Sequence, residues 1–269
     1  MEFKEKINLS ELTTIRCGGK AEWYAECQNE NDLTEALAFA EAKNMPVQIL
    51  GGGSNIIFPD AGFMGIVIRY IKNKIKADKN ILIAEAGVLW DDLVKFSIAK
   101  NLQGLECLSG IPGLVGASPI QNIGAYGTEV GNSIVYVKCF DKLSKKYVTF
   151  ENDECEFGYR TSAFKTKWLD KYIITEVCFS LYENKEPKIL YSELKSEIEK
   201  IQGYEELENK EKLQAVRDKV LEIRRSKSMV LNPEDINTHS CGSFFTNPII
   251  PEARYYMHKH LDDVPAFKI

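Results

Sequence analysis

One segment constrains the fold of this chain more than any other: residues 104–127 read GLECLSGIPGLVGASPIQNIGAYG. It holds six glycines and two prolines but a single charged side chain, that of Glu106. Solvated loops are normally polar, so an uncharged segment punctuated by glycine and proline is expected to lie against other parts of the protein. The rest of the chain must therefore build a frame of helices and strands around a long, irregular backbone.

Hydrophobic spacing in the flanking sequence predicts an α+β frame. In the first third, Asn31 and Asp32 form a plausible cap before helically spaced apolar residues, and Pro46 ends that helix. Strands are expected at 47–50, 56–58, 65–70 and 81–86, followed by a helix at 90–100. Beyond the uncharged segment, strands are expected at 134–140, 146–150 and 172–181, and a long charged helix at 206–227.

Composition limits the class of protein and its partners. With 269 residues, 44% hydrophobic and 27% charged, the chain is typical of a globular protein of about two domains. It has no apolar run of the ~18–20 residues that a membrane span needs, and no signal-peptide stretch, so we expect a cytoplasmic protein without a membrane partner. The net charge of −5 argues against nucleic acid as a partner. Seven scattered cysteines and three histidines predict reduced thiols and no metal site.

The first motif that suits ligand binding is GGGSN, from Gly51 to Asn55, directly after a predicted buried strand. Glycine lets backbone N–H groups approach a ligand closely, which suits a diphosphate. The motif lacks the Lys-Ser/Thr of a P-loop, and it does not open a helix as a Gly-x-Gly-x-x-Gly fingerprint does. From these residues alone, a phosphate cradle and a plain tight turn both stay open.

Three further motifs place polar side chains in apolar or glycine-rich surroundings. The uncharged segment sets Ser118, Gln121 and Asn122 in a rigid backbone, which suits either the lining of a bulky cofactor or a connection between strands. Arg160, in FGYRTSAFK, is either a partly desolvated anion site or a surface cation. Ser243, in SCGSFFTNP, lies where a hydroxyl needs a partner or a function. No Ser-His-Asp order or Gly-x-Ser-x-Gly elbow supports a hydrolase.

Together these motifs resemble the UDP-N-acetylenolpyruvoylglucosamine reductase family of peptidoglycan precursor synthesis. The matching stretches are ILGGGSNIIF, GLECLSGIPGLVGASPIQNIGAYG, CEFGYRTSAFK and HSCGSFFTNP, in the family's order. The resemblance implies an α+β fold, with an FAD-binding domain of the vanillyl-alcohol-oxidase (PCMH) type in two α/β lobes at residues 1–183. An incomplete α+β substrate-binding domain is expected at residues 184–269. The family continues past the segment that matches Pro265–Ile269 with a helix and a catalytic glutamate, so this domain is expected to lack its C-terminal part.

The resemblance also implies cofactors, a substrate and site residues. It implies a monomer with noncovalent FAD, in keeping with the absence of a histidine beside Gly51–Asn55, and with NADPH as hydride donor and UDP-N-acetylglucosamine enolpyruvate as substrate. Arg160 matches the family's active-site arginine, and Ser243 matches the serine that protonates the intermediate. Flavin contacts are expected from Gly51, Gly52, Gly53, Ser54, Asn55, Gly116, Ala117, Ser118, Gln121 and Gly124. Substrate contacts are expected from Tyr126, Tyr191, Lys227 and Asn247.

The implied reaction gives these residue types a role. NADPH reduces FAD, the flavin passes a hydride to the alkene, and negative charge then develops toward the substrate carboxylate. A guanidinium at Arg160 stabilises that charge in a water-poor site, and Ser243 protonates the adjacent carbon. The product is UDP-N-acetylmuramate. The alternative is a catalytically incomplete flavin-binding fragment, because the tail with the glutamate is absent.

Overall fold

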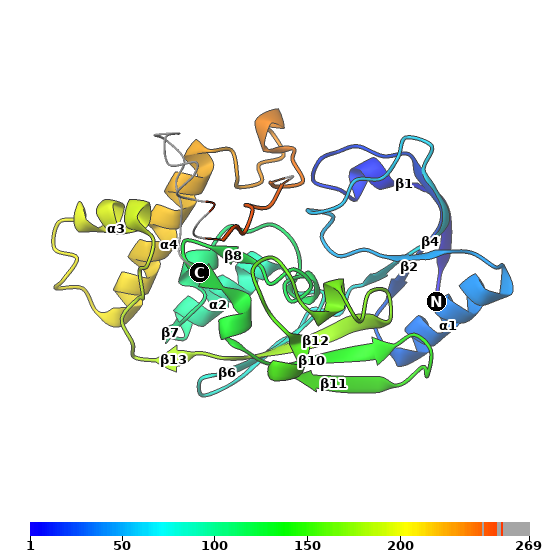
Figure 1. Ribbon diagram of the computed structural model, residues 1–269, viewed down its shortest axis with the longest axis horizontal. Coiled ribbons are helices and arrows are strands. Elements are labelled where there is room, and N and C mark those ends of the chain that lie inside the picture. The colour runs from blue at the N-terminus through cyan, green and yellow to red at the C-terminus, as the bar shows by residue number, and fades with distance from the viewer. Residues whose placement is uncertain (244, 252–253, 255–269) are drawn as a thin grey trace.

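The computed structural model describes residues 1–243, 245–251 and 254, and two β-sheets form its frame (Figure 1). The first sheet contains β1 (Phe3–Asn8), β2 (Lys20–Cys27), β3 (Val47–Ile49) and β4 (Phe63–Tyr70). The second contains β5 (Ile75–Asp78), β6 (Ile81–Glu85), β10 (Ile134–Asp141), β11 (Tyr147–Glu151) and β12 (Tyr172–Ser180). The first has the order β1-β2-β4-β3, with parallel pairs at β4, and the second is antiparallel in the order β11-β10-β12-β6-β5.

Helix α1 (Glu30–Ala42) covers the first sheet. Its buried stripe, Leu33 with three further apolar residues, shares a hydrophobic cluster with Ile66 of β4 and Phe140 of β10, so the two sheets are packed into one body. The cap predicted at Asn31 and Asp32 was wrong by two residues: Asn29 is the N-cap. Its side-chain oxygen accepts a hydrogen bond from the backbone N–H of Asp32 at 3.0 Å. An N-cap side chain bonds the N–H two or three residues further on, so Asp32 is the third residue of the helix and not its cap.

Helix α2 (Trp90–Ala99) covers the second sheet, where the predicted strands and helix agree closely with the observed ones. Trp90 is fully buried, and its Nε1 donates to the carbonyl of Leu108 at 2.9 Å. This bond joins the helix to the uncharged segment. Leu105, Leu108 and Val115 of that segment are also fully buried, so it does lie against the rest of the protein.

Helices α3 (Ser192–Glu199) and α4 (Asn209–Ser226) pack on each other and on the 3-10 turn at Glu106–Leu108, at the left of Figure 1. Helix α4 begins three residues after the predicted start at residue 206. Glu208 and Glu211 form a reciprocal capping box there, and it satisfies the first free N–H groups of the helix.

The remaining elements are short. They are β7 (Leu102–Gln103), β8 (Gly124–Ala125), β9 (Thr128–Glu129), β13 (Tyr182–Glu183) and 3-10 turns at 9–11, 106–108, 115–117, 130–132, 153–155, 163–165 and 236–238. The strand predicted at 56–58 is absent. Phe58 is buried in the hydrophobic cluster that contains Leu9, and it packs against Gly18, while Ile57 is half exposed. The chain therefore bends here and does not pair with a neighbouring strand.

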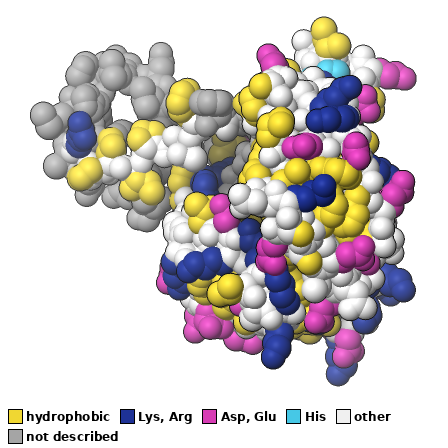
Figure 2. Space-filling model, turned by 90° about the vertical axis from the view of Figure 1, so that its right-hand side faces the viewer, with side chains coloured by type: hydrophobic (Ala, Val, Ile, Leu, Met, Phe, Trp, Pro, Cys, Tyr) yellow, Lys and Arg dark blue, Asp and Glu magenta, His cyan; other side chains and the backbone are white. Residues whose placement is uncertain are grey.

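The surface of the N-terminal side is mixed in character. Figure 2 views the molecule from that side and shows hydrophobic side chains gathered among basic and acidic ones, without a patch of one charge. Within the described residues, no helix has both the length and the hydrophobicity that crossing a bilayer requires.

Candidate functional site

Two glycine-rich loops, residues 51–55 and 109–127, contact each other. A Cβ atom on Gly52 would lie 2.7 Å from the Cα of Gly113, so the two backbones are in direct contact. Ser54 Oγ donates to the carbonyl of Pro112 at 3.1 Å, and Asn55 Nδ2 donates to Gln121 Oε1 at 3.3 Å. The fold thus joins the first two sequence motifs into one surface.

The first loop presents unused backbone donors. Among the described residues, the N–H groups of residues 51–55 donate to no protein acceptor, whereas the carbonyl of Gly53 accepts a bond from Thr14 N–H at 3.0 Å. Successive free N–H groups form an anion-binding concavity, and unpaired backbone donors otherwise cost free energy. This arrangement fits the diphosphate of FAD, and where Gly52 meets Gly113 no side chain lies between the two loops.

The motif that contains Arg160 is tied to the second loop at three points. Ser162 Oγ donates to the carbonyl of Ile120 at 2.6 Å, and Arg160 Nη2 donates to the carbonyl of Gly124 at 2.8 Å. The side chain of Asn122 donates to the carbonyl of Gly158 at 3.0 Å. The third sequence motif is therefore fixed against the loop expected to line the flavin.

Arg160 sits at the third position of a tight turn between Gly158 and Thr161, whose backbones exchange two hydrogen bonds of 3.1 and 3.2 Å. Its φ of 55° is in the left-handed region, which costs a non-glycine residue roughly 1–2 kcal/mol. Lys165 Nζ donates to the Arg160 carbonyl at 3.1 Å and supports this conformation. The half-buried Arg160 side chain donates one hydrogen bond to the carbonyl of Gly124, and its other N–H groups can bind an anion.

A second cluster gathers three of the expected substrate residues. The rings of Tyr126 and Tyr191 meet edge to face, with centroids 5.6 Å apart. Lys227 Nζ contacts both carboxylate oxygens of Glu193 at 2.8 Å, and this hydrogen bond raises the pKa of Lys227. Burial raises the pKa of the Tyr126 hydroxyl, opposed by the nearby charges of Arg224 and Lys227. The rings of Tyr126 and Tyr191 therefore lie beside Lys227, which is half exposed and can be reached by an anionic ligand.

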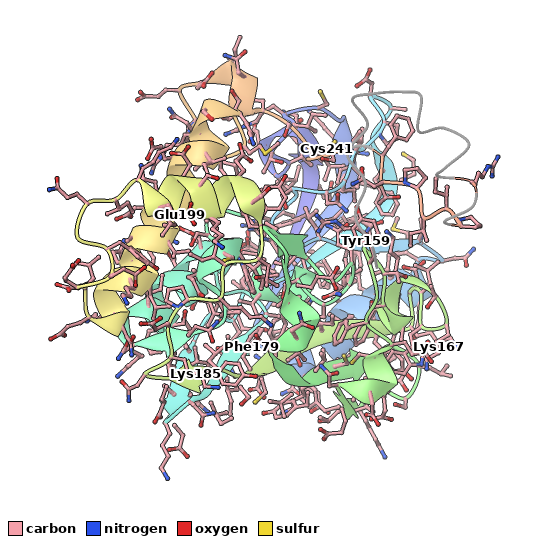
Figure 3. The ribbon with its side chains drawn as sticks, turned by 60° about the vertical axis from the view of Figure 1, so that its left-hand side comes forward. Tyr159, Lys167, Phe179, Lys185, Glu199 and Cys241 are labelled. Carbon is pink, nitrogen blue, oxygen red and sulfur yellow. The ribbon has the colours of Figure 1, made fainter. Side chains whose placement is uncertain are left out.

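Ser243 and Asn247 lie on exposed chain beyond the helices. Within the described residues, no hydrogen bond joins either of them to Arg160 or to the tyrosine pair. The segment is nevertheless anchored to the first glycine loop: Thr14 Oγ1 donates to the carbonyl of Ser240 at 2.6 Å, and Thr14 N–H binds Gly53. Figure 3 labels Cys241 and Tyr159, which mark the serine segment and the arginine turn.

Helix α4 holds the start of the second loop. Asp91 accepts bonds from both terminal nitrogens of Arg217 at 2.7 Å and from the N–H of Gly110 at 2.8 Å. Arg224 Nη2 donates to the carbonyl of Gly110 at 3.3 Å. Burial raises the pKa of Asp91, but the bonds from Arg217 and Gly110 outweigh it and lower that pKa to about 2. The ion pair between Asp91 and Arg217, with the bond from Gly110 to Asp91, therefore joins α2, α4 and the second loop.

Replacing Arg217 by methionine is expected to lower the free energy of unfolding by about 1.5–3 kcal/mol, the range for hydrogen bonds to a charged group. Because folding lowers the pKa of Asp91 from 3.8 to about 2, the ionised pair stabilises the protein above pH 3.8 and is lost as the pH falls toward 2. The difference between wild type and variant should shrink over that interval in denaturant titrations. Arg225→Met, on the exposed side of α4, is the control, and a difference that stays constant with pH would contradict the assignment.

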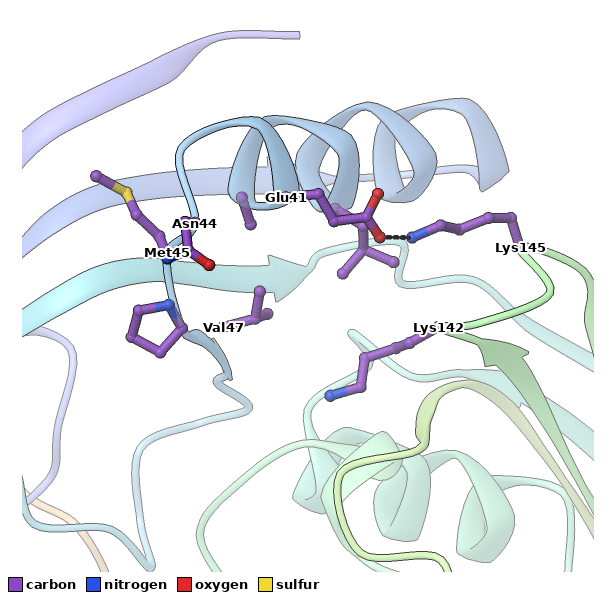
Figure 4. Close-up of a pocket in the computed structure, with 9 residues that line it drawn as sticks. Glu41, Asn44, Met45, Val47, Lys142 and Lys145 are labelled. Atoms are coloured by element: carbon purple, nitrogen blue, oxygen red, sulfur yellow. Dashed lines mark hydrogen bonds and ion pairs between the residues drawn. The ribbon is translucent and has the colours of Figure 1, made fainter.

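A separate pocket of about 360 Å³ lies between the end of α1 and the turn from β10 to β11 (Figure 4). Lys145 pairs there with Glu41 at 2.7 Å, while burial lowers the pKa of Lys142, which reaches toward the pocket. None of the expected site residues lines it, so it is not part of the candidate site.

Sequence reasoning missed several residues that organise this site. The sequence marks Asn122 only as a polar residue of the loop, and it does not single out Thr14, Glu193 or Arg217. An asparagine within a glycine-rich stretch is one usable signal, since asparagine tolerates positive φ better than most residues. The others carry no local signal, because their partners lie far away in the sequence.

Known proteins resemble this chain in sequence. Residues 21–145, which include both glycine-rich loops, match a family described as an FAD binding domain. A Nocardia farcinica protein named UDP-N-acetylenolpyruvoylglucosamine reductase is 39% identical over 267 residues, covering 97% of this chain and 68% of that protein. Its namesake from Mycolicibacterium smegmatis is 40% identical over 260 residues, with 95% and 70% covered. The chain thus spans about two thirds of the length of these relatives.

A solved structure supports the fold. The UDP-N-acetylenolpyruvylglucosamine reductase of Thermus caldophilus superposes with a TM-score of 0.67 at 24% identity, over 97% of this chain and 81% of that one. Together with the matched FAD binding domain, this confirms the predicted α+β fold with a flavin domain of the vanillyl-alcohol-oxidase type.

Proposed function

Because the chain belongs to the UDP-N-acetylenolpyruvoylglucosamine reductase family, we propose that it uses NADPH to reduce UDP-N-acetylglucosamine enolpyruvate to UDP-N-acetylmuramate. It is an FAD-dependent oxidoreductase by family and by its FAD-binding domain. The observation that carries the proposal is the guanidinium of Arg160, held by the Gly124 carbonyl at the edge of the two glycine loops.

FAD, when bound, supplies the two-electron chemistry that links a nicotinamide to an alkene. We assign its diphosphate to the free N–H groups of residues 51–55, and the rest of the cofactor to the second loop from Gly116 to Gly124. The hydrogen bonds between Ser54, Asn55 and the second loop keep the two halves of this cradle at a fixed separation.

Arg160 binds the carboxylate of the enolpyruvyl group. Reduction of the alkene leaves negative charge on the carbon beside this carboxylate, and a fixed cation in a water-poor site stabilises that charge more than a mobile one. The turn conformation and the Gly124 carbonyl hold the guanidinium in place before substrate arrives. Ser243 then donates its hydroxyl proton to the same carbon.

The UDP-sugar is assigned to Tyr126, Tyr191, Lys227 and Asn247. Lys227 neutralises the diphosphate, and the tyrosine rings close over the sugar end of the substrate. We place the boundary between the FAD-binding region and the substrate-binding domain at residues 183 and 184, where β13 ends and the chain leads to α3.

The experiment follows the two half-reactions by flavin absorbance. The purified chain, loaded with FAD, is expected to bleach when NADPH is added and to regain its yellow colour when the enolpyruvyl substrate follows, with UDP-N-acetylmuramate as product. Bleaching without recovery would instead identify a flavin-binding module without reductase activity. Bleaching by an alcohol or a lactone, with no response to NADPH, would indicate another FAD-linked oxidase.

Replacing Glu193 by glutamine is expected to lower the KM for the UDP-substrate by up to about fivefold. The Glu193 carboxylate competes with the substrate diphosphate for Lys227, and a half-exposed ion pair of this kind contributes about 0.2–1 kcal/mol. Steady-state kinetics at low salt measure the change. Glu199→Gln, on the exposed face of the same helix, is the matched control (Figure 3). A KM that rises in Glu193→Gln alone would show that the carboxylate helps substrate binding.

A further inference from the structure

Asn122 is a buried asparagine with a left-handed backbone conformation, which asparagine tolerates better than most residues. Its side chain is 2% exposed, and its φ is 46°. The left-handed region is sparsely occupied by residues other than glycine, and buried examples are kept only where the surrounding structure fixes them. The contacts of its amide group identify what it fixes.

The carboxamide of Asn122 uses both of its polar atoms. Oδ1 accepts a hydrogen bond from the N–H of Gly131 at 2.8 Å. Nδ2 donates to Glu129 Oε2 at 2.8 Å and to the carbonyl of Gly158 at 3.0 Å. The Asn122 side chain therefore joins two separate stretches of chain: β9 with the turn that follows it, which holds Glu129 and Gly131, and the turn that begins at Gly158.

The third contact leads to Arg160. Gly158 opens the tight turn in which Arg160 stands, so the Asn122 amide holds the backbone end of this residue. The other end is held by Gly124, only two residues after Asn122, whose carbonyl accepts the bond from the guanidinium. Residues 122–124 therefore hold both the backbone turn that contains Arg160 and the guanidinium of its side chain.

We propose that Asn122 is a positioning residue for Arg160, which fixes the arginine turn against the second glycine loop through the carbonyl of Gly158. This inference rests on the proposed role of Arg160 in the reaction. Asn122 touches neither substrate nor reacting atoms in this account; it acts by holding the guanidinium ready for the carboxylate.

Asn122→Asp is the sharpest test. It keeps the shape of the side chain and the acceptor for Gly131, but it removes the donor to Gly158 and sets a carboxylate against Glu129. Asn152→Asp is the matched control, since Asn152 Nδ2 also donates to two carbonyls, of Gly131 and Ile134, at 2.8 Å each. Neither of these carbonyls belongs to the arginine turn.

The first readout needs neither flavin nor substrate. Phenylglyoxal modifies arginine, and peptide mass spectrometry gives the rate at Arg160, with the exposed Arg225 as internal reference. Arg160 should react about fivefold faster in Asn122→Asp than in wild type, as expected when a hydrogen bond of ordinary strength is lost, and at the wild-type rate in Asn152→Asp. Equal Arg160 rates in all three proteins, or equal acceleration in both variants, would overturn the proposal.

The second readout separates the half-reactions. Asn122→Asp should slow flavin reoxidation by the enolpyruvyl substrate about tenfold through misplacement of Arg160, and should slow bleaching by NADPH less than this. Equal loss in both half-reactions would show a general structural role and overturn the proposal. If wild type itself does not reduce the substrate, the proposed function fails, while the labelling still decides the positioning role.

Should Asn122→Asp fail to fold, the double variant Asn122→Asp with Glu129→Gln replaces it. The glutamine amide relieves the repulsion between two carboxylates, while Gly158 still lacks its donor. The same increase in Arg160 labelling is expected from this double variant, and its absence would count against the proposal.

Discussion

Ser243→Ala is expected to leave the bleaching of bound flavin by NADPH unchanged and to slow formation of UDP-N-acetylmuramate by about 10²–10⁴-fold. The hydroxyl is the proposed proton donor to the carbon that gains negative charge, and alanine has no proton to give. A serine is a weak acid, so its role depends on the high basicity of that carbon. Rapid-mixing absorbance records the two half-reactions separately.

Ser240→Ala is the matched control for this variant. Ser240 lies three residues away on the same segment. Among the described residues, its hydroxyl oxygen accepts a single bond, of 3.3 Å from the N–H of Gly242, while its carbonyl makes the contact with Thr14. Substitution should therefore leave both half-reactions near wild type. Equal slowing of both half-reactions in Ser243→Ala would remove Ser243 from the proton-transfer step.

Gly52→Ala is expected to weaken FAD binding by about 5- to 150-fold. The added Cβ would lie 2.7 Å from the Gly113 Cα, so the two glycine loops must move apart. Overpacking of this kind costs about 1–3 kcal/mol, and a tenfold change in affinity corresponds to 1.4 kcal/mol. Titration of the flavin-free chain with FAD, followed by quenching of flavin fluorescence, measures the change.

Gly203→Ala controls for the general cost of replacing a glycine. Gly203 lies between α3 and α4, and the nearest atom to its added Cβ is Glu206 Oε2 at 3.7 Å. Its positive φ makes the substitution mildly strained, yet the FAD affinity should match wild type. An unchanged affinity in Gly52→Ala would show that the contact between the loops does not shape the flavin site.

Local patterns predicted the parts of this fold whose burial is regular. In the second sheet, strands β6, β10, β11 and β12 and helix α2 were placed to within about two residues, whereas the short strand β5 was not predicted. Strand β1, with the sequence FKEKIN, was not predicted, because charged side chains at an exposed sheet edge hide its alternation. The strand expected at 56–58 failed for the opposite reason, since three apolar residues suggested an extension that a bend replaces.

In the candidate site too, the sequence predicted one part and not the other. Residue types with chemistry of their own, such as Arg160 and the glycines of residues 51–55, were visible in the sequence. Their arrangement was not, because the contact of Gly52 with Gly113, the pairing of Lys227 with Glu193 and the role of Asn122 each depend on chain segments brought together by folding.

We propose that the free N–H groups of residues 51–55 and the second glycine loop together hold one FAD. The most direct measurement is titration of the purified, flavin-free chain with FAD, followed by acid or heat denaturation of the complex. We expect saturation at one FAD per chain, a flavin absorbance spectrum, and release of all the flavin on denaturation. A chain that stays colourless and does not bind added FAD, or that keeps its flavin after denaturation, would contradict it.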